Sequence, residues 1–237
     1  MKAFLMMGQS NMAGRGDLDE VEPLHNKHTF VLRNGRWQPM TEPLNIDRPI
    51  KFKGKMGLNS GVGPAASFAV SYAEYYDEDI GLIPCAEGGS SLEDWRIDGQ
   101  LFLNAYYQAK LAMNVGELVG IIWHQGEAEC SLPERALNYK DRFLEIMNEL
   151  QARLGVKLDI VVGELGRFYA EHPGKPPYFD DVNRALNELA QLDNIAIASS
   201  EGLTDRGDSL HFNALSQREF GRRYFEAYKT LKNHIKE

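Results

Sequence analysis

Short apolar runs alternate along the chain with longer stretches in which apolar residues recur every three or four positions. We predict strands at the apolar runs, residues 2–7, 79–84, 118–124, 158–163 and 194–198. We predict helices at the periodic stretches, residues 64–77, 101–115, 133–153, 179–191 and 214–233. The runs are rich in Ile, Leu and Val, which is typical of strands buried on both faces. The alternation indicates an α/β fold of β-α units around a parallel sheet.

Two of the predicted helices have an apolar face and a capping residue at their N-terminus. The apolar face of the third helix consists of Leu137, Phe143, Leu144, Met147, Leu150 and Leu154. Ser131 and Glu134 have the spacing of a capping box before it. The apolar face of the last helix consists of Phe220, Tyr224, Tyr228 and Leu231. Asn213 is placed to cap this helix, and we expect both faces to pack on the sheet.

Residues 8–63 interrupt the alternation, because this segment far exceeds the usual loop of about 2 to 6 residues in α/β units. Within it, residues 29–33 and 36–38 flank Asn34-Gly35, which predicts a small hairpin with a type I′ turn. Long excursions are often functional, so we expect this segment to cover the active-site end of the sheet. The chain has no internal repeat or linker, so we predict a single domain spanning residues 1–237.

Charge and composition narrow the class of function. The chain has 26 Lys+Arg against 34 Asp+Glu, a net charge of −8, and therefore no basic field that attracts nucleic acid or an anionic membrane. No run approaches the roughly 18 apolar residues of a membrane span, and the N-terminal stretch becomes polar too early for a signal peptide. Cys85 and Cys130 fit neither a disulfide framework nor a zinc site. We expect a cytoplasmic protein without nucleic-acid or membrane partners, and leave its oligomeric state open.

Polar residues gather where predicted strands end. In parallel sheets, ligands bind beyond the carboxyl ends of the strands. Residues 8–11, 86–91 and 124–127 follow three of the strands, and residues 208–211 precede the last helix. We expect these segments to converge on one site.

Ser10 is a candidate nucleophile in the first of these segments. A lone serine after a strand also suits a turn or a helix cap, and its hydroxyl needs a base to attack an ester. Among the six histidines, His211 stands three residues after Asp208. That spacing lets the carboxylate accept the Nδ1–H of the imidazole and leaves Nε2 to take the serine proton. Taken alone, the same spacing also suits a pair in a surface loop.

Donors for an oxyanion are found in two other segments. Gly88 and Gly89 can present backbone N–H groups, and Gln125 has a side-chain amide. A tight turn and a loop hydrogen bond explain the same residues equally well. Glu127 is a possible accessory residue that either orients Gln125 or acts as a second carboxylate toward His211, and the sequence does not choose between these roles.

Sugar binding and metal binding are the remaining questions of chemistry. We assign substrate binding to Asn11, Arg15, Trp95 and Arg96, with Trp37 as a further stacking surface; ordinary packing is the alternative. The cluster of His124, Glu127, Glu129 and Cys130 is compact enough for a metal, but the chain has no HExxH motif. We predict no metal and no other cofactor.

Four segments resemble the conserved blocks of the SGNH hydrolase superfamily, in the form found in carbohydrate esterase family 6 and sialate O-acetylesterase-like proteins. They are GQSNMAGR at residues 8–15, PCAEGGS at 84–90, WHQGE at 123–127 and DSLH at 208–211. The resemblance implies a flavodoxin-like, three-layer α/β/α sandwich with a five-stranded parallel sheet. It also implies that Ser10, His211 and Asp208 form a triad, that Gly88 or Gly89 and Gln125 form the oxyanion hole, and that no metal is used.

These observations predict a serine esterase that hydrolyses acetyl or other short acyl esters of carbohydrates, similar to acetylxylan esterases. The substrate is expected to be a small-molecule or oligosaccharide acetyl ester. The alternatives are a sialate O-acetylesterase, a short-chain lipase or thioesterase and, in a different class, a non-catalytic carbohydrate-binding module. The Gly-x-Ser-x-Gly elbow of α/β-hydrolases is absent from the sequence.

Overall fold

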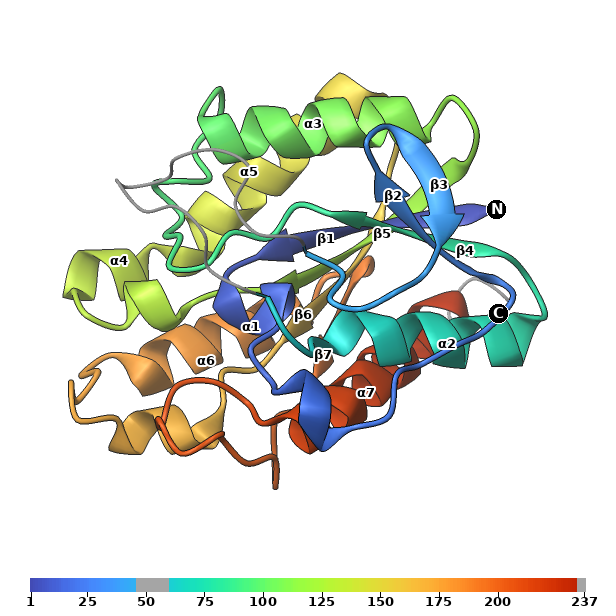
Figure 1. The fold of residues 1–237 in the computed structure, drawn as a ribbon. Coiled ribbons are helices and arrows are strands. Elements are labelled where there is room, and N and C mark those ends of the chain that lie inside the picture. The colour runs from blue at the N-terminus through green and yellow to red at the C-terminus, as the bar shows by residue number, and fades with distance from the viewer. Residues whose placement is uncertain (46–59, 234–237) are drawn as a thin grey trace.

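The computed structural model describes residues 1–45 and 60–233, and a seven-stranded sheet in the order β3-β2-β4-β1-β5-β6-β7 forms its centre (Figure 1). Five parallel strands form the main part of the sheet: β1 (Lys2–Gly8), β4 (Ile80–Pro84), β5 (Glu117–His124), β6 (Asp159–Gly163) and β7 (Ile195–Ala198). These are the five strands predicted from the apolar runs, with ends shifted by no more than one residue. The α/β fold class is confirmed.

The count of five strands is wrong, because the predicted hairpin joins the sheet. Its strands are β2 (Thr29–Arg33) and β3 (Arg36–Pro39), and Asn34 and Gly35 between them both have positive φ, as a type I′ turn requires. β2 pairs in parallel with β4, so the hairpin extends the sheet at its edge rather than covering the active-site end. Part of the long segment, residues 46–59, lies outside the described residues.

Helices cover both faces of the sheet. One face carries α2 (Pro64–Tyr76) and α7 (Ala214–Asn233), and the other carries α3 (Gln100–Ala112), α5 (Tyr139–Leu154) and α6 (Phe179–Leu189). Short helical turns complete the described chain: α1 (Ser10–Ala13), η1 (Leu18–Glu20), η2 (Glu127–Glu129), α4 (Pro133–Leu137) and η3 (Arg167–Glu171). None of the described helices has the length and apolar content of a membrane span.

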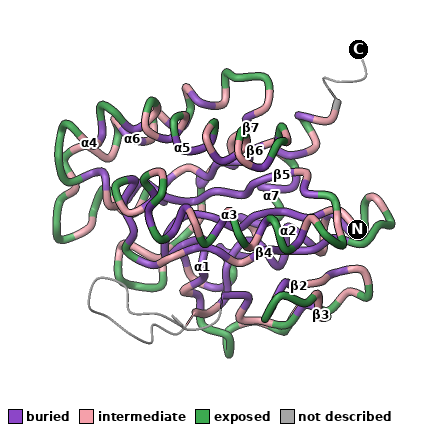
Figure 2. Tube along the Cα trace, turned by 90° about the horizontal axis from the view of Figure 1, so that it is seen from above, coloured by how far each residue is buried: buried purple, intermediate pink, exposed green. Residues whose placement is uncertain are grey.

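The alternation of side chains along β1 explains the two cores. Leu5 and Met7 pack with α3, α5 and α6, whereas Phe4 and Met6 pack with α2 and α7. Figure 2 shows the consequence, with buried strands in the middle and exposed residues on the outer sides of the helices. The prediction that the strands are buried on both faces is confirmed.

The predicted helix 133–153 is divided into α4 and α5 at Asn138. The predicted capping box is wrong: Leu132 is extended before Pro133 and becomes the N-cap, so the helix starts one residue later than a Ser131 cap requires. Leu137, which we placed on the apolar face, is 69% exposed because it ends α4 before the break. The cap of α7 is confirmed, since Asn213 Oδ1 accepts the N–H of Ser216 at 2.8 Å.

Candidate active site

The polar segments meet at the point where the order of the sheet reverses. β1 lies between β4 and β5, so the loops that follow these strands leave the sheet side by side, where α/β folds bind ligands. The N–H of Gln9 donates to His124 O at 2.8 Å, and the N–H of Glu87 donates to Gly8 O at 3.0 Å. Gly8 has φ 128°, and a Cβ there would lie 2.0 Å from His124 O. Glycine is therefore required for the three loops to approach this closely.

Ser10, His211 and Asp208 lie in the geometry of a serine-hydrolase triad. Ser10 opens α1, and the other two residues belong to the loop before α7. His211 Nε2 lies 3.0 Å from Ser10 Oγ, and His211 Nδ1 lies 2.8 Å from Asp208 Oδ2. Because a carboxylate accepts hydrogen bonds, Nδ1 donates to Asp208 and Nε2 accepts from the serine hydroxyl. The arrangement can withdraw the proton from Ser10 as the hydroxyl attacks a carbonyl.

Asp208 is held as an ionised partner of His211. Its Oδ1 accepts the N–H of His211 at 2.7 Å and the N–H of Leu210 at 2.9 Å. Partial burial raises the pKa of Asp208, but these hydrogen bonds and the imidazole contact outweigh burial and leave the pKa below its ordinary value. The carboxylate therefore stays charged at neutral pH, as a partner of an imidazolium must.

Asn11 is used inside the protein in this structure, and its predicted binding of substrate stays a prediction. Its side chain is buried between the loops. Asn11 Nδ2 donates to Glu127 Oε1 at 2.6 Å and to Leu210 O at 3.1 Å, and Asn11 Oδ1 accepts the N–H of Phe212 at 3.2 Å. Both the nitrogen and the oxygen of this amide are therefore hydrogen-bonded to groups of the protein.

Both predicted roles of Glu127 are wrong in this structure. Its buried carboxylate contacts Asn11 and His124, whose Nε2 lies 3.3 Å from Glu127 Oε1, rather than Gln125 or His211. Burial raises the pKa of Glu127, but the adjacent His124 and the hydrogen bond from Asn11 outweigh it and leave the pKa below its ordinary value. The chain thus keeps a buried charge next to the triad.

Gln125 is buried, and its side-chain amide is hydrogen-bonded inside the protein. Its Nε2 donates to the carboxylate of Glu129 and to Ser90 O, so both N–H groups of the amide are taken up inside the protein. The predicted oxyanion role of Gln125 is therefore not met in this orientation of its side chain. Among the residues that the structure describes, Gln125 Oε1 has no hydrogen-bond partner.

Glu129, which the sequence indicated only as a metal ligand, has a structural role in the site. It accepts the N–H of Leu92 at 2.8 Å in addition to the amide of Gln125, and so joins the loops after β4 and β5. Burial raises the pKa of Glu129 to about 7. The available signal was its position four residues after Gln125, across the tight η2 turn.

The glycines of the β4 loop lie beside the end of β1. Gly89 has φ 72°, in the left-handed region that favours glycine, and the loop is held by Ser90 Oγ, which lies 3.3 Å from Gly8 O. The N–H of Ser10 stands in the first turn of α1, where a helix offers no internal acceptor. The β4 loop therefore lies beside Gly8, two residues before the proposed nucleophile. The assignment of Gly88 or Gly89 to an oxyanion hole stays a prediction.

The two tryptophans predicted to stack on sugars are used for packing. Trp95 is 0% exposed, and its Nε1 donates to Ser90 Oγ at 3.0 Å. Trp37 packs over β4, where a Cβ at Gly81 would lie 2.5 Å from its ring. The stacking prediction is wrong for Trp95, because its ring is fully buried. Trp37 is only half-buried, and its stacking on a sugar stays a prediction.

The two predicted arginines lie in different surroundings. Arg96 is exposed and donates to Glu93 O at 3.2 Å within its own loop. The carbonyl of Arg15 accepts from Arg206 at 2.5 Å, and the N–H of Arg206 donates to His211 O at 2.9 Å. Arg15 is therefore next to the triad loop, and its binding of substrate stays a prediction.

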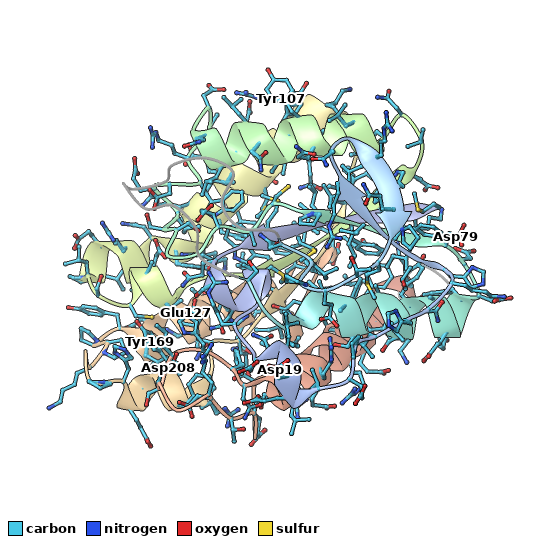
Figure 3. The ribbon with its side chains drawn as sticks, viewed as in Figure 1. Asp19, Asp79, Tyr107, Glu127, Tyr169 and Asp208 are labelled. Atoms are coloured by element: carbon cyan, nitrogen blue, oxygen red, sulfur yellow. The ribbon has the colours of Figure 1, made fainter. Side chains whose placement is uncertain are left out.

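Tyr169 of η3 is a neighbour of the site that the sequence did not indicate. Its hydroxyl donates to the carbonyl of Glu127 at 3.1 Å, and Figure 3 shows Tyr169, Glu127 and Asp208 on the same side of the molecule. Tyr169 and Glu127 are 42 positions apart, so no local sequence pattern indicates this hydrogen bond. In the described part of the chain, no three His, Cys, Asp or Glu side chains are grouped to hold a metal ion.

Comparison with known proteins fits this geometry. The family of carbohydrate esterases described as sialic acid-specific acetylesterases matches residues 1–230. The chain belongs to this family. A probable carbohydrate esterase of Arabidopsis thaliana is 28% identical to this esterase over 245 residues, which cover 95% of the chain and 89% of the relative.

Solved structures show the same fold. An Arabidopsis thaliana protein superposes with a TM-score of 0.84 at 26% identity, over 97% of this chain and 98% of that chain. The structure of NanS superposes with a TM-score of 0.76 at 15% identity, over 98% of this chain and 97% of that chain. A carbohydrate acetylesterase from Xanthomonas citri gives 0.67 at 17% identity over 97% of this chain and 56% of that chain. The SGNH resemblance is confirmed, and placement in carbohydrate esterase family 6 stays a prediction. This protein is an ester hydrolase of the carbohydrate acetylesterase type.

Proposed function

We propose that this esterase removes O-acetyl groups from carbohydrates through a Ser10–His211–Asp208 triad. The observation that supports this most directly is the 3.0 Å contact between Ser10 Oγ and His211 Nε2, with Asp208 on the other ring nitrogen. Ser10 Oγ attacks the acetyl carbonyl while its proton moves to His211 Nε2, forming a tetrahedral oxyanion. His211 then gives this proton to the sugar oxygen, and the ester bond breaks to leave acetyl-Ser10 and the free sugar hydroxyl.

Deacylation uses the same groups in reverse. A water molecule gives a proton to His211 Nε2 and attacks the acetyl carbonyl of acetyl-Ser10. Collapse of the second oxyanion releases acetate, and the proton returns to Ser10 Oγ. Asp208 holds Nδ1–H throughout and stabilises the imidazolium that forms twice in each cycle. Backbone N–H groups of Ser10 and of Gly88 or Gly89 are the proposed oxyanion donors, each contributing about 10² to 10³ in turnover.

The test compares hydrolysis of p-nitrophenyl acetate and fluorophosphonate labelling in the wild-type protein and in Ser10→Ala. We expect Ser10→Ala to abolish labelling and to lower kcat by at least about 10³-fold. Ser131→Ala, which removes an exposed serine, is the matched control and should keep both signals. Labelling that persists in Ser10→Ala would refute the proposed nucleophile. A protein that binds acetylated sugars without labelling would instead be a carbohydrate-binding module.

The sugar is the second part of the proposal. The family description favours acetylated sialic acid, whereas our motif interpretation favours acetylated xylan. Initial rates on acetylated sialic acid, acetylated xylo-oligosaccharides and longer acyl esters distinguish these substrates. A preference for long acyl chains would indicate the lipase or thioesterase alternative.

A further inference from the structure

A chain of buried polar side chains extends from the nucleophile into the interior and has no part in the proposed proton transfers. It begins at Asn11, next to Ser10, and continues through Glu127 to His124. His124 Nδ1 lies 3.3 Å from the hydroxyl of Tyr224 on α7, and this hydroxyl donates to Trp123 O at 2.9 Å. Burial of so many polar groups is costly unless they are held in a defined arrangement.

The amide of Asn11 connects the nucleophile to the base. Ser10 precedes it directly in the chain, while Leu210 and Phe212, the two neighbours of His211, are its partners across the site. Nδ2 donates to Leu210 O at 3.1 Å and Oδ1 accepts the N–H of Phe212 at 3.2 Å. One planar group therefore sets how the His211 loop lies against Ser10.

Glu127 and the two backbone partners together determine which way this amide faces. An amide can be turned over so that its nitrogen and oxygen exchange places, and the turned amide would present a carbonyl oxygen to Glu127 and to Leu210 O. A carboxylate has no hydrogen to donate, so Glu127 Oε1, at 2.6 Å, accepts Asn11 Nδ2 and excludes the turned form. His124 in turn fixes the carboxylate of Glu127. The His124 ring is itself held by T-shaped contacts with the rings of Phe212 and Phe220.

We propose that Glu127 is a positioning residue, which acts through Asn11 to keep the base His211 at hydrogen-bond distance from Ser10. This inference rests on the proposed triad. A carboxylate that contributed only to packing would be replaceable by an apolar side chain. Glu127 instead remains an ionised acceptor, because His124 and Asn11 hold its pKa below the ordinary value despite burial.

A double-mutant cycle on kcat tests the proposal. Glu127→Ala and Asn11→Ala should each lower kcat by about 10²-fold with little change in KM, since the substrate-facing groups remain. The double variant should be no slower than Asn11→Ala, because Glu127 acts through that amide. Glu129→Gln is the matched control: it changes a buried carboxylate of the same η2 turn that contacts Gln125, so its effect should multiply with that of Asn11→Ala.

Glu127→Gln separates position from charge. Its carbonyl oxygen can still accept Asn11 Nδ2, so we expect it to recover much of the kcat lost in Glu127→Ala, with an unchanged midpoint of the acid limb of the pH–rate profile. The cycle can be built with Glu127→Gln if the alanine variant does not fold, as thermal unfolding will show.

Three outcomes would overturn the positioning role: effects of Asn11→Ala and Glu127→Ala that multiply, a loss confined to KM, or a Glu127→Gln variant as slow as Glu127→Ala. Failure of the triad has a different signature, because Ser10→Ala would then keep the activity and the labelling of the wild-type protein. The two results are therefore read from different variants.

Discussion

The polar residues of the site act through the direction of their hydrogen bonds. Asp208 can only accept, and it takes both the ring Nδ1–H and the backbone N–H of His211. Its side chain is 41% exposed, and because its partial burial raises the pKa, the low pKa comes from these donors. The tautomer of His211 therefore depends on a carboxylate that solvent can reach.

Asp208→Asn tests this dependence. The amide NH₂ of asparagine would face Nδ1, favour the tautomer with hydrogen on Nε2, and leave no acceptor for the Ser10 proton. We expect kcat to fall by about 10³ to 10⁴-fold while KM and thermal stability change little. Asp193→Asn, in an exposed loop between α6 and β7, is the control and should keep wild-type kcat. A fall of less than tenfold in Asp208→Asn would mean that the carboxylate does not orient His211.

The residues of the proposed triad could be selected from the sequence because the chemistry of each is expressed in a short pattern. Ser10 follows a strand, and Asp208 precedes His211 by three residues. The roles of Asn11 and Trp95 were not predictable, since their partners are set by contacts with distant loops and with the sheet. A polar or aromatic residue next to a motif has the same appearance in sequence whether it faces the substrate or the core.

At the scale of the elements, the sequence predicted where the five apolar strands begin and end, but not that the hairpin strand β2 pairs with β4. Apolar runs fix β1 and β5, but nothing in the run at residues 29–33 tells that it pairs with β4, more than 45 positions away. Asn138 divides a stretch whose apolar period continues across the break. Glu129 similarly joins two loops, after β4 and β5, through one short helical turn.

The buried carboxylate of Glu129 makes this junction sensitive to pH. Its pKa is raised to about 7 in the folded protein, above the ordinary value of 4.5, so the folded state disfavours the charged form. The contribution of Glu129 to stability is therefore greatest below pH 4.5, falls as pH rises toward 7, and is constant above it. Glu129→Gln removes this dependence, and its amide can still accept the N–H of Leu92 while donating to a turned Gln125.

Urea unfolding at pH 5 and pH 8 measures the effect. The free energy of unfolding of Glu129→Gln, relative to the wild-type protein, should rise by on the order of 3 kcal/mol between these values. Glu134→Gln, an exposed glutamate of α4, is the control and should show no such rise. A difference between Glu129→Gln and wild type that is the same at both pH values would show that Glu129 is not held neutral by burial.

At the scale of the whole molecule, the last helix holds the segment that follows the nucleophile. Figure 1 shows α7 next to the early part of the chain, which returns from α1 toward the β2–β3 hairpin. Gly16 packs so closely on α7 that a Cβ would lie 2.6 Å from Ala214 Cα. Arg218 of α7 donates to both oxygens of Glu42, at 2.6 and 2.5 Å, and also to Glu22 O at 3.3 Å.

This ion pair joins α7, which follows the loop of His211, to the chain that follows β3. The side chains of Arg218 and Glu42 are 7% and 4% exposed, so each charge has lost most of its water and depends on the other. The alternation of apolar and polar residues does not reveal such a pair, because its partners are separated by 176 positions. Its contribution can be measured apart from catalysis, since neither residue contacts the triad.

We expect Glu42→Leu to lower the free energy of unfolding by about 3 to 5 kcal/mol, because it leaves the guanidinium of Arg218 buried without a counter-charge. Arg218→Met should cost a similar amount. The double variant should recover most of this loss, since no unpaired charge then remains, and should keep a kcat close to that of the wild-type protein. Urea unfolding of the four proteins gives the coupling energy directly. Additive losses in the double variant would mean that the two side chains stabilise α7 through separate contacts and not as a pair.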